Sequence, residues 1–242
     1  LINKFRGDIR LFEPGVKMIE ELCGVPVIGV LPYFKDIFVE EEDNLQLASK
    51  ARHASGNGKV SVAVVLLRHI SNFTDFNMLE RDSRVNLYYA DSAEDISKAD
   101  IIIIPGSKST LADLSLLRKS GMAQAIIKAA ESGKTVVGIC GGYQMMGTMI
   151  SDPEGMPGLG LLPMHTVMNR EKTTKQVRFG LNGSDSCDME GYEIHNGRTE
   201  ADSGSSIRPL CTRQDGTHDG CIAGERCMGT YIHGILDNSG FV

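Results

Sequence analysis

Long hydrophobic runs are missing from this 242-residue chain. Its longest apolar stretches, such as VAVVLL at 62–67, are far too short for a membrane-spanning helix, which needs roughly 20 residues. The chain also has no stretch with the layout of a signal peptide. We therefore expect no membrane partner and a cytoplasmic location.

Runs of positive charge and closely paired cysteines are also missing. The net charge is −6 and no basic cluster occurs, which argues against a nucleic-acid partner. The six cysteines include no C-x-x-C pair, so structural zinc and dithiol redox chemistry have little support and no metal site is predicted. Without an export signal, we expect the thiols to be reduced.

The phosphate-binding motif G-x-x-x-x-G-K-[ST] is absent as well. The stretch GNGKVS at 56–61 contains glycine and lysine, but it lacks the spacing that lets backbone amides enclose a phosphate. Hydrophobic residues make up 41% of the sequence, which is ample for a packed core.

The first part of the chain predicts one α/β unit followed by a connector. A helical stretch at 15–24 is followed closely by the apolar run VPVIGV at 25–30. The acidic run at 40–43 and the small polar residues at 54–59 are typical of a connector. Because residue 1 is Leu rather than Met, we interpret the chain as a fragment of a longer protein.

From residue 59 onward, predicted strands and helices alternate. Strands are expected at 61–67, 85–90, 101–104 and 135–139. Their continuous apolar character favours a parallel sheet covered on both faces. Helices are expected at 109–119 and 122–132. Beyond residue 160 the segments are short, glycine-bounded and β-like. The predicted fold class is therefore α/β, with a mostly parallel sheet flanked by helices and an additional β-rich C-terminal part.

Cys140 stands where a predicted strand meets two glycines, in the stretch TVVGICGGYQMMG. Strand, glycine turn and a helix at 143–150 predict a sharp elbow, because glycine neighbours accommodate a strained backbone at its tip. Amides at the start of that helix favour the thiolate over the thiol and can stabilise an oxyanion. The alternative is a small buried cysteine at a strand end.

A nucleophilic cysteine needs a base, and two histidines occupy suitable glycine-flanked segments. His195 lies in GYEIHNG and His233 in GTYIHG, where a strand end can present the ring to a cleft. A satisfied core or surface histidine is the alternative for either one. That alternative is our interpretation of His53, His69 and His218.

Taken together, these segments resemble the cobyric acid synthase family of the CobQ type, whose C-terminal part is a class I glutamine amidotransferase domain of flavodoxin-like fold. The elbow GICGGYQ and the distant YIHG resemble the nucleophile and base segments of class I glutamine amidotransferases. The family resemblance rests on eight blocks in the right order: INKFRGD, PVIGVLPY, HISNFTDFN, IIIIPGSKSTLADLSLLRKSG, GICGGYQMMG, GLGLLPMHT, GYEIHNGRT and GTYIHGILDN.

The resemblance implies one half of a two-part enzyme. In this family an N-terminal P-loop domain uses ATP and Mg²⁺ to activate carboxylates of a corrinoid, and the C-terminal domain supplies ammonia from glutamine. Residues 1–35 resemble the end of that ATP-binding, dethiobiotin-synthetase-like domain, 36–58 a linker, and 59–242 the amidotransferase domain. ATP and Mg²⁺ are expected at the N-terminal domain, and no cofactor is expected in this fragment.

The implied reaction belongs to cobalamin biosynthesis. It amidates the b, d, e and g carboxylates of adenosylcobyrinic acid a,c-diamide with nitrogen from glutamine. The implied partners are glutamine, the corrinoid and the N-terminal ATP-binding domain of the same protein.

The resemblance also implies roles for individual residues. Cys140 corresponds to the nucleophile, and His233 corresponds to the base that activates it and then protonates the departing ammonia. The backbone amides of Gly141 and of the turn formed by Gly106 and Ser107 correspond to the oxyanion hole.

The support of the base is less clear from the resemblance. Ile235 stands where the wider class carries a glutamate two residues after the histidine, so a Cys-His pair is implied. Asp237, Glu193 or a group from the N-terminal domain could orient the imidazole instead. His195 shares a block with Glu193 and has no assigned role, whereas Gln144 corresponds to a position lining the glutamine pocket.

Other interpretations stay open at this point. A cobyrinic acid a,c-diamide synthase and a CobQ-like cell-wall amidotransferase are close enzymatic alternatives, although NKFRGD and SNFTDFN favour the cobyric acid synthase family. A catalytically silent binding or regulatory module would be expected to have lost Cys140 or His233, and both are present. A metal site built from Cys140, His195 and His233 has no short ligand spacing to support it.

Overall fold

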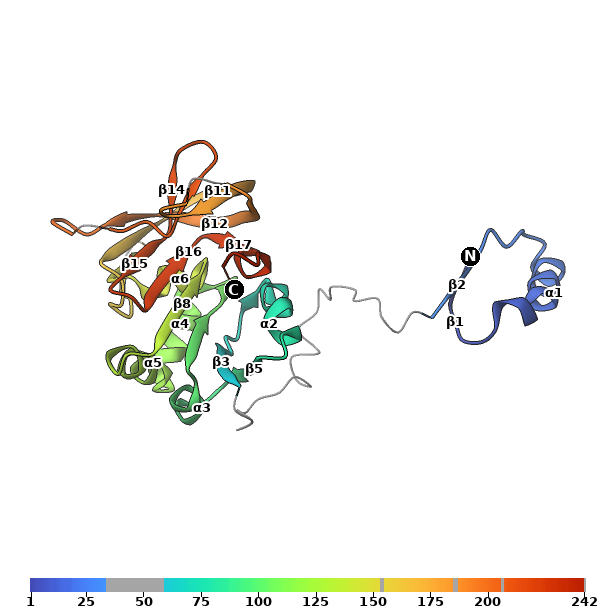
Figure 1. Ribbon diagram of the computed structural model, residues 1–242, viewed down its shortest axis with the longest axis horizontal. Coiled ribbons are helices and arrows are strands. Elements are labelled where there is room, and N and C mark those ends of the chain that lie inside the picture. The colour runs from blue at the N-terminus through green and yellow to red at the C-terminus, as the bar shows by residue number, and fades with distance from the viewer. Residues whose placement is uncertain (34–58, 153–154, 185–186, 206, 242) are drawn as a thin grey trace. The chain divides into compact units, whose positions relative to one another are not determined.

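The computed structural model describes residues 1–33, 59–152, 155–184, 187–205 and 207–241. The chain divides into two units, residues 1–42 and 43–242, which are described separately (Figure 1). The predicted linker at 36–58 lies outside the described residues, so the predicted domain boundaries stay a prediction.

The smaller unit is a β-α-β element. Strand β1 (Ile2–Phe5) pairs in parallel with β2 (Val30–Pro32). Helix α1 (Glu13–Cys23) lies between them in the chain, after the 3-10 helix η1 (Ile9–Leu11). Helix α1 buries none of its residues within this unit. The predicted helix is therefore confirmed, with Met18 and Leu22 exposed and Val16 and Ile19 half-buried.

The predicted strand at 25–30 is wrong, because only its last residue enters β2. Gly24 ends α1 in the left-handed conformation, with a φ of 66°. Pro26 has no N–H to donate, and the amide of Val27 donates to the Glu20 carboxylate at 2.8 Å. This stretch is therefore tied to the helix rather than to a strand.

The larger unit contains a six-stranded sheet in the order β15-β16-β8-β6-β3-β5. Its strands are β3 (Val60–Val65), β5 (Val85–Ala90), β6 (Ile101–Ile104), β8 (Thr135–Ile139), β15 (Cys221–Ala223) and β16 (Cys227–Thr230). All neighbours are parallel except β15, which is antiparallel to β16. Three of the four predicted strands have the predicted bounds, and the mostly parallel α/β class is confirmed.

Three helices cover one face of this sheet (Figure 1). They are α3 (Ala93–Lys98), α4 (Thr110–Lys119) and α5 (Met122–Glu131). Ser92 caps α3 by accepting a hydrogen bond from the amide of Asp95 at 3.2 Å. The strands beneath them are apolar on both sides, because Val64 and Ile102 are both completely buried.

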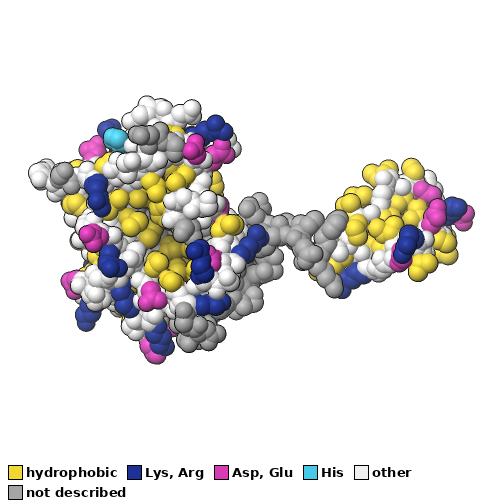
Figure 2. All heavy atoms as spheres, in the orientation of Figure 1, with side chains coloured by type: hydrophobic (Ala, Val, Ile, Leu, Met, Phe, Trp, Pro, Cys, Tyr) yellow, Lys and Arg dark blue, Asp and Glu magenta, His cyan; other side chains and the backbone are white. Residues whose placement is uncertain are grey.

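The other face of the sheet is only partly covered within the described residues. Helix α2 (Asn77–Arg81) and the 3-10 helix η4 (Ile235–Asp237) lie there, and an apolar hollow of about 580 Å³ includes Val62, Ile103 and Val137 in its lining. Hydrophobic side chains gather visibly on the larger unit in Figure 2. Val62, Ile103 and Val137 are nevertheless buried beneath this hollow, and described elements lie on both faces of the sheet, as predicted.

A second, seven-stranded sheet follows in the larger unit, and most of its pairings are antiparallel. Its main order is β10-β9-β11-β12-β17, with β13 beside β11 and β14 beside β13. The strands are β9 (Met149–Ser151), β10 (Met156–Pro157), β11 (Met164–Leu181), β12 (Met189–Ala201), β13 (Cys211–Arg213), β14 (His218–Asp219) and β17 (Ile232–His233). The predicted β-rich C-terminal part is confirmed.

The prediction of short strands is wrong for β11 and β12, which have 18 and 13 residues. Glycines that suggested strand ends lie inside β12 instead. Gly197 has a φ of 92° and lies where the register between the two strands shifts, as expected of a glycine at a bulge. Gly191 packs so closely on Ile232 that a Cβ would lie 2.5 Å from its side chain.

Candidate active site

Cys140 lies at the elbow between β8 and helix α6 (Gly141–Met146). Its φ of 52° and ψ of −107° form a conformation that costs a non-glycine residue about 1–3 kcal/mol. Only glycine fits at position 142, since a Cβ there would lie 1.9 Å from the Ile104 carbonyl oxygen. The helix ends at Met146, so the predicted helix at 143–150 is too long and its end forms part of β9.

His233 reaches the same point from β17 and is completely buried. Its Nδ1 atom lies 2.7 Å from Oδ2 of Asp75, and the Gly234 amide donates to Oδ1 of Asp75 at 3.0 Å. Its ring also interacts with the Cys140 thiol. Burial opposes the charged ring, but the hydrogen bonds to Asp75 and Cys140 outweigh burial and raise the pKa of His233 to about 10.

Asn72 and Tyr192 hold the His233 ring from two other directions. The amide nitrogen of Asn72 lies 2.9 Å from Nε2 of His233, and the Tyr192 ring stacks on the imidazole at 5.3 Å between centroids. The same Asn72 nitrogen lies 3.2 Å from Nδ1, so the amide packs against the ring and is not in line with either N–H bond. The ring is thus fixed in place on several sides.

Asp75 is the residue of the candidate site that sequence reasoning missed. It lies in the 3-10 helix η3 (Phe73–Phe76), and only 2% of it is exposed. The predicted candidates for this task were Asp237, which is exposed at the end of η4, and Glu193, which lies in another cluster. An acidic residue between Phe73 and Phe76 is a signal that could have indicated it, because a buried carboxylate needs a partner.

The predicted oxyanion residues lie directly beside the elbow. Gly106 and Ser107 form strand β7, which pairs with β4 (Ile70–Ser71). A Cβ on Gly141 would lie 2.8 Å from the backbone nitrogen of Ser107, so the amides of these two residues are close neighbours. Two amides in this arrangement can stabilise negative charge on a reacting carbonyl oxygen.

Asp113 in α4 anchors this pair of strands. Its carboxylate accepts a hydrogen bond from the Ser107 hydroxyl at 2.6 Å and lies 2.9 Å from Nδ1 of His69. His69 therefore has a structural partner, in agreement with its sequence-based interpretation.

Gln144 is buried in the wall of the same cleft, but its amide is already occupied. Its nitrogen donates to the Asn196 carbonyl at 2.8 Å and to the Tyr231 hydroxyl at 3.2 Å, and its oxygen accepts from Thr110. In this arrangement Gln144 ties α6 to β12 through its polar atoms. Its predicted role at the glutamine pocket stays a prediction.

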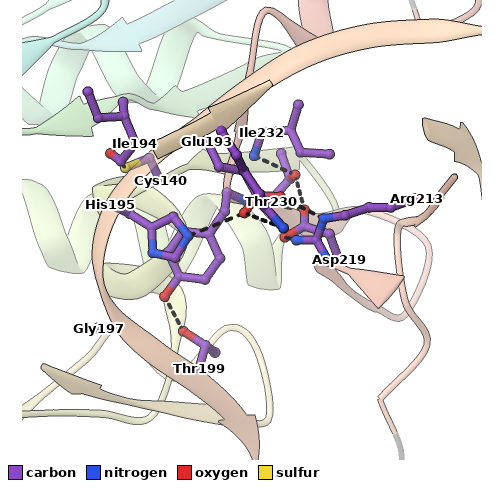
Figure 3. Close-up of polar contacts among 12 residues, drawn as sticks. Cys140, Glu193, Ile194, His195, Gly197, Thr199, Arg213, Asp219, Thr230 and Ile232 are labelled. Carbon is purple, nitrogen blue, oxygen red and sulfur yellow. Dashed lines mark hydrogen bonds and ion pairs between the residues drawn. The ribbon is translucent and has the colours of Figure 1, made fainter. Parts of the chain in front are cut away.

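Glu193 and His195 lie in β12 and belong to a buried charge network behind the cleft (Figure 3). Arg213 donates to Glu193 at 2.6 Å and to Asp219 at 2.9 Å. Nε2 of His195 lies 3.5 Å from the Glu193 carboxylate. Burial of Glu193 opposes its charge, but hydrogen bonds from His195 and Arg213 outweigh burial and lower the pKa of the carboxyl.

Several of these residues line one cleft of about 1110 Å³. Its lining includes Asn72, Ser107, Cys140, Gln144, His195 and Lys172. Cys140 reaches this cleft and is also 3.6 Å from the Ile194 carbonyl oxygen. The structure therefore brings the predicted nucleophile, the predicted base and the predicted oxyanion amides together, and His195 lines the same cleft from β12.

Two further features concern the described residues only. They contain no group of three or more His, Cys, Asp or Glu side chains placed to hold a metal ion. Among the helices described, none combines the length and apolar character that crossing a membrane requires.

Comparisons with known proteins agree with this geometry. Residues 61–241 match the CobB/CobQ-like glutamine amidotransferase domain. The chain is 57% identical to a cobyric acid synthase of Phocaeicola vulgatus, with all of the chain and 50% of the relative covered. It is 59% identical to a cobyric acid synthase of Bacteroides fragilis, with 98% of the chain and 49% of the relative covered. The chain thus spans about half the length of these curated relatives.

Solved structures support the fold at lower sequence identity. PurLQS from Thermotoga maritima covers 72% of this chain, and 87% of its own chain is covered, with a TM-score of 0.56 and 20% identity. A glutamine amidotransferase structure has a TM-score of 0.54 at 18% identity. The match covers 72% of this chain and 89% of the chain of that structure. With its elbow cysteine, buried histidine and matched domain, the chain belongs to the CobB/CobQ-like glutamine amidotransferase family.

Proposed function

We propose that this chain hydrolyses glutamine and supplies the ammonia for a cobyric acid synthase. The single observation that carries the proposal is that the buried ring of His233 interacts with both the Cys140 thiol and the Asp75 carboxylate, beside a cleft that Cys140 lines. A nucleophile, a base and an orienting acid in contact form the arrangement that nucleophilic acyl transfer requires.

In the first half-reaction the proton of the Cys140 thiol passes to His233, and the sulfur attacks the side-chain amide carbon of glutamine. The amides of Gly141 and Ser107 stabilise the oxyanion that forms. His233 then gives its proton to the amide nitrogen, the C–N bond breaks, and ammonia leaves. Because the pKa of His233 is raised to about 10, the ring holds this proton at neutral pH until the leaving group takes it.

In the second half-reaction a water molecule replaces ammonia at the thioester. His233 takes a proton from this water, the hydroxide attacks the carbonyl carbon, and the C–S bond breaks to give glutamate. Asp75 accepts a hydrogen bond from Nδ1 of His233 and stabilises the imidazolium, which is the role that a buried carboxylate has beside a catalytic histidine.

For the whole protein, we propose amidation of the b, d, e and g carboxylates of adenosylcobyrinic acid a,c-diamide. ATP and Mg²⁺ would be bound by the N-terminal domain, of which residues 1–35 would be the end, and would activate the carboxylates. The support is the name cobyric acid synthase shared by relatives of 57% and 59% identity. The proposed partners are glutamine, the corrinoid and that domain, and the proposed location is the cytoplasm.

The test is Cys140→Ala in the full-length protein, with cobyrinic acid a,c-diamide as the substrate and either glutamine or ammonium salts as the nitrogen source. Glutamine-dependent amidation should be abolished and ammonia-dependent amidation preserved, because only ammonia release uses the thiol. Equal loss of both activities would contradict the proposed role of Cys140. Failure of the unmodified protein to amidate this corrinoid would contradict the corrinoid assignment.

The choice of base is tested by comparing His233→Asn with His195→Asn. General bases contribute about 10²–10⁴-fold in rate, so His233→Asn should lower glutamine hydrolysis at least 100-fold. His195→Asn should retain turnover at saturating glutamine. The reverse result would show that His195 is the base.

A further inference from the structure

His195 has one ring nitrogen without a partner. Its side chain is nine-tenths buried, it lies in the lining of the Cys140 cleft, and its Nδ1 atom is buried without a hydrogen bond in the described part of the chain. A buried polar atom without a partner typically costs about 1–3 kcal/mol, so such an atom in a binding cleft indicates a ligand group that would satisfy it.

The other ring nitrogen determines what kind of group this is. Nε2 faces Glu193, whose carboxylate is also held by Arg213 at 2.6 Å and by Lys175 at 3.7 Å. A carboxylate only accepts hydrogen bonds, so Nε2 carries the hydrogen and donates. Nδ1 of the neutral ring is then a bare acceptor, and its missing partner is an N–H or O–H donor.

The ring is also held in a fixed plane. It stacks on Tyr231 with 3.8 Å between centroids and 20° between planes. The Tyr231 hydroxyl is itself engaged with Thr199 at 2.5 Å and with the amide of Gln144 (Figure 3 shows the neighbouring part of this network). Because its stacking partner is fixed, His195 has little freedom to turn Nδ1 toward another protein group.

The position of His195 along β12 is one residue past the contact with the nucleophile, because the Ile194 carbonyl oxygen lies 3.6 Å from the Cys140 sulfur. Tyr192 is the residue of β12 that pairs with His233, and His195 follows three residues later. Residues in a strand advance about 3.3 Å each, so the two positions are about 10 Å apart along β12. His195 therefore lies between the Ile194 contact and Asn196, a position that suits the α-carbon end of a glutamine whose side-chain amide is at the sulfur. Lys172 pairs with the neighbouring Asn196 and lines the same cleft, which suits the α-carboxylate at that end.

We propose that Nδ1 of His195 accepts a hydrogen bond from the α-ammonium group of glutamine and so selects an amino acid over a simple amide. This inference rests on the proposed glutaminase function. It gives His195 a substrate-binding role that differs from the role of the base, and it makes Glu193 the residue that fixes the acceptor form of the ring.

The experiment measures binding without turnover. The full chain carrying Cys140→Ala is titrated in a calorimeter with glutamine and with glutaramate, which is glutamine without its α-amino group. Glutamine should bind more tightly than glutaramate by about 10- to 100-fold, the range expected for one hydrogen bond to a charged group. Adding His195→Phe keeps a ring to stack on Tyr231 but removes the acceptor, so it should weaken glutamine to the level of glutaramate and leave glutaramate unchanged.

Two further variants separate acceptor loss from general damage. His195→Asn can place an amide oxygen near the position of Nδ1 and should restore part of the preference for glutamine. His218→Phe makes the same exchange at an exposed position outside the cleft and should change neither affinity. An unchanged preference for glutamine in His195→Phe would overturn the proposal.

A direct measurement covers the case in which His195→Phe fails to fold. In the Cys140→Ala chain with ¹⁵N-labelled histidine, glutamine should shift the Nδ1 resonance of His195, and glutaramate should not. Equal shifts with both ligands would overturn the α-ammonium contact. If the chain binds neither ligand, the proposed glutaminase function and this inference both fail. Glutamine binding without discrimination contradicts only the inference.

Discussion

The two sheets of the larger unit differ in the kinds of side chain that they bury. In the mostly parallel sheet the middle strands are apolar on both sides, and residues such as Val64 and Ile102 are completely buried. In the second sheet, buried positions include the charged residues Glu193 and Asp219, which Arg213 joins. The first sheet therefore depends on apolar packing, and the second depends on a complete set of charge partners.

The candidate site combines one catalytic element from each sheet. Cys140 follows a strand of the parallel sheet, so local backbone geometry determines its position. His233 lies in the second sheet, and a carboxylate from η3 fixes its ring. The difference teaches that a nucleophile can be positioned by one tight turn, whereas a base needs partners from distant parts of the chain.

Asp75→Asn tests the contact between the two regions and should have the largest effect. The amide keeps the shape of the carboxylate but removes the charge that stabilises the imidazolium, so glutamine hydrolysis should fall by about 10²–10⁴-fold. Steady-state release of ammonia from glutamine measures it. Asp237→Asn is the matched control, since Asp237 is exposed, and its activity should stay within about twofold. A larger loss of glutamine hydrolysis in the control than in Asp75→Asn would indicate that Asp237 orients the His233 imidazole.

Arg213→Met tests whether the second sheet depends on its charges. It leaves Glu193 and Asp219 buried without their shared cation, so the free energy of unfolding should fall by about 3–5 kcal/mol. Urea unfolding followed by circular dichroism gives the value. The control is Arg198→Met, because Arg198 is 79% exposed. A loss of less than about 1 kcal/mol at position 213 would show that both sheets depend mainly on apolar packing.

The sequence predicted the parallel sheet well, because its signals are local. The strands at 85–90, 101–104 and 135–139 have their predicted bounds. Each is a mainly apolar run, followed by Asp91, by Pro105 and by the Cys140-Gly141 turn respectively. Cys140 was placed at the elbow for the same reason, since the glycines that permit its backbone conformation are adjacent to it.

The second sheet and the orienting acid could not be predicted in the same way. In the sequence, the glycines inside β12 look like strand ends. They are required instead by close contacts with neighbouring strands that lie elsewhere in the chain. Asp75 precedes His233 by most of the domain, and only the packing of η3 against η4 brings them together. Residue spacing in the sequence does not reveal such a contact, so Asp237 and Glu193, which are closer to the histidine block or share its segment type, were predicted as the orienting acid instead.

The pH dependence of stability offers a smaller test of the same contact. The pKa of His233 rises from 6.5 to about 10 in the folded protein, so its pairing stabilises the fold fully below about pH 6.5. This contribution declines above that value and is lost as the pH passes through about 10. The difference in Tm between the unmodified protein and Asp75→Asn should therefore shrink from pH 6.5 to 10. A difference that stays constant over this range would contradict the raised pKa.

Arg178→Gln should have the smallest effect. Arg178 and Glu190 form a cross-strand pair at 2.6 Å between β11 and β12, but their side chains are 63% and 66% exposed. Exposed pairs of this kind contribute about 0–1 kcal/mol, so urea unfolding should show a change within that range. A loss comparable to that of Arg213→Met would mean that surface charges and buried charges contribute equally to the second sheet.

The order of the three reactive residues along the chain has a consequence for synthesis on the ribosome. Asp75 is made first, Cys140 second and His233 close to the end of the described chain. Strand β16, which completes the pairing of β8, is made only a few residues before His233. A nascent chain therefore carries its nucleophile through the synthesis of 93 further residues without this base beside it, and the thiol gains its partner only when β17 is added.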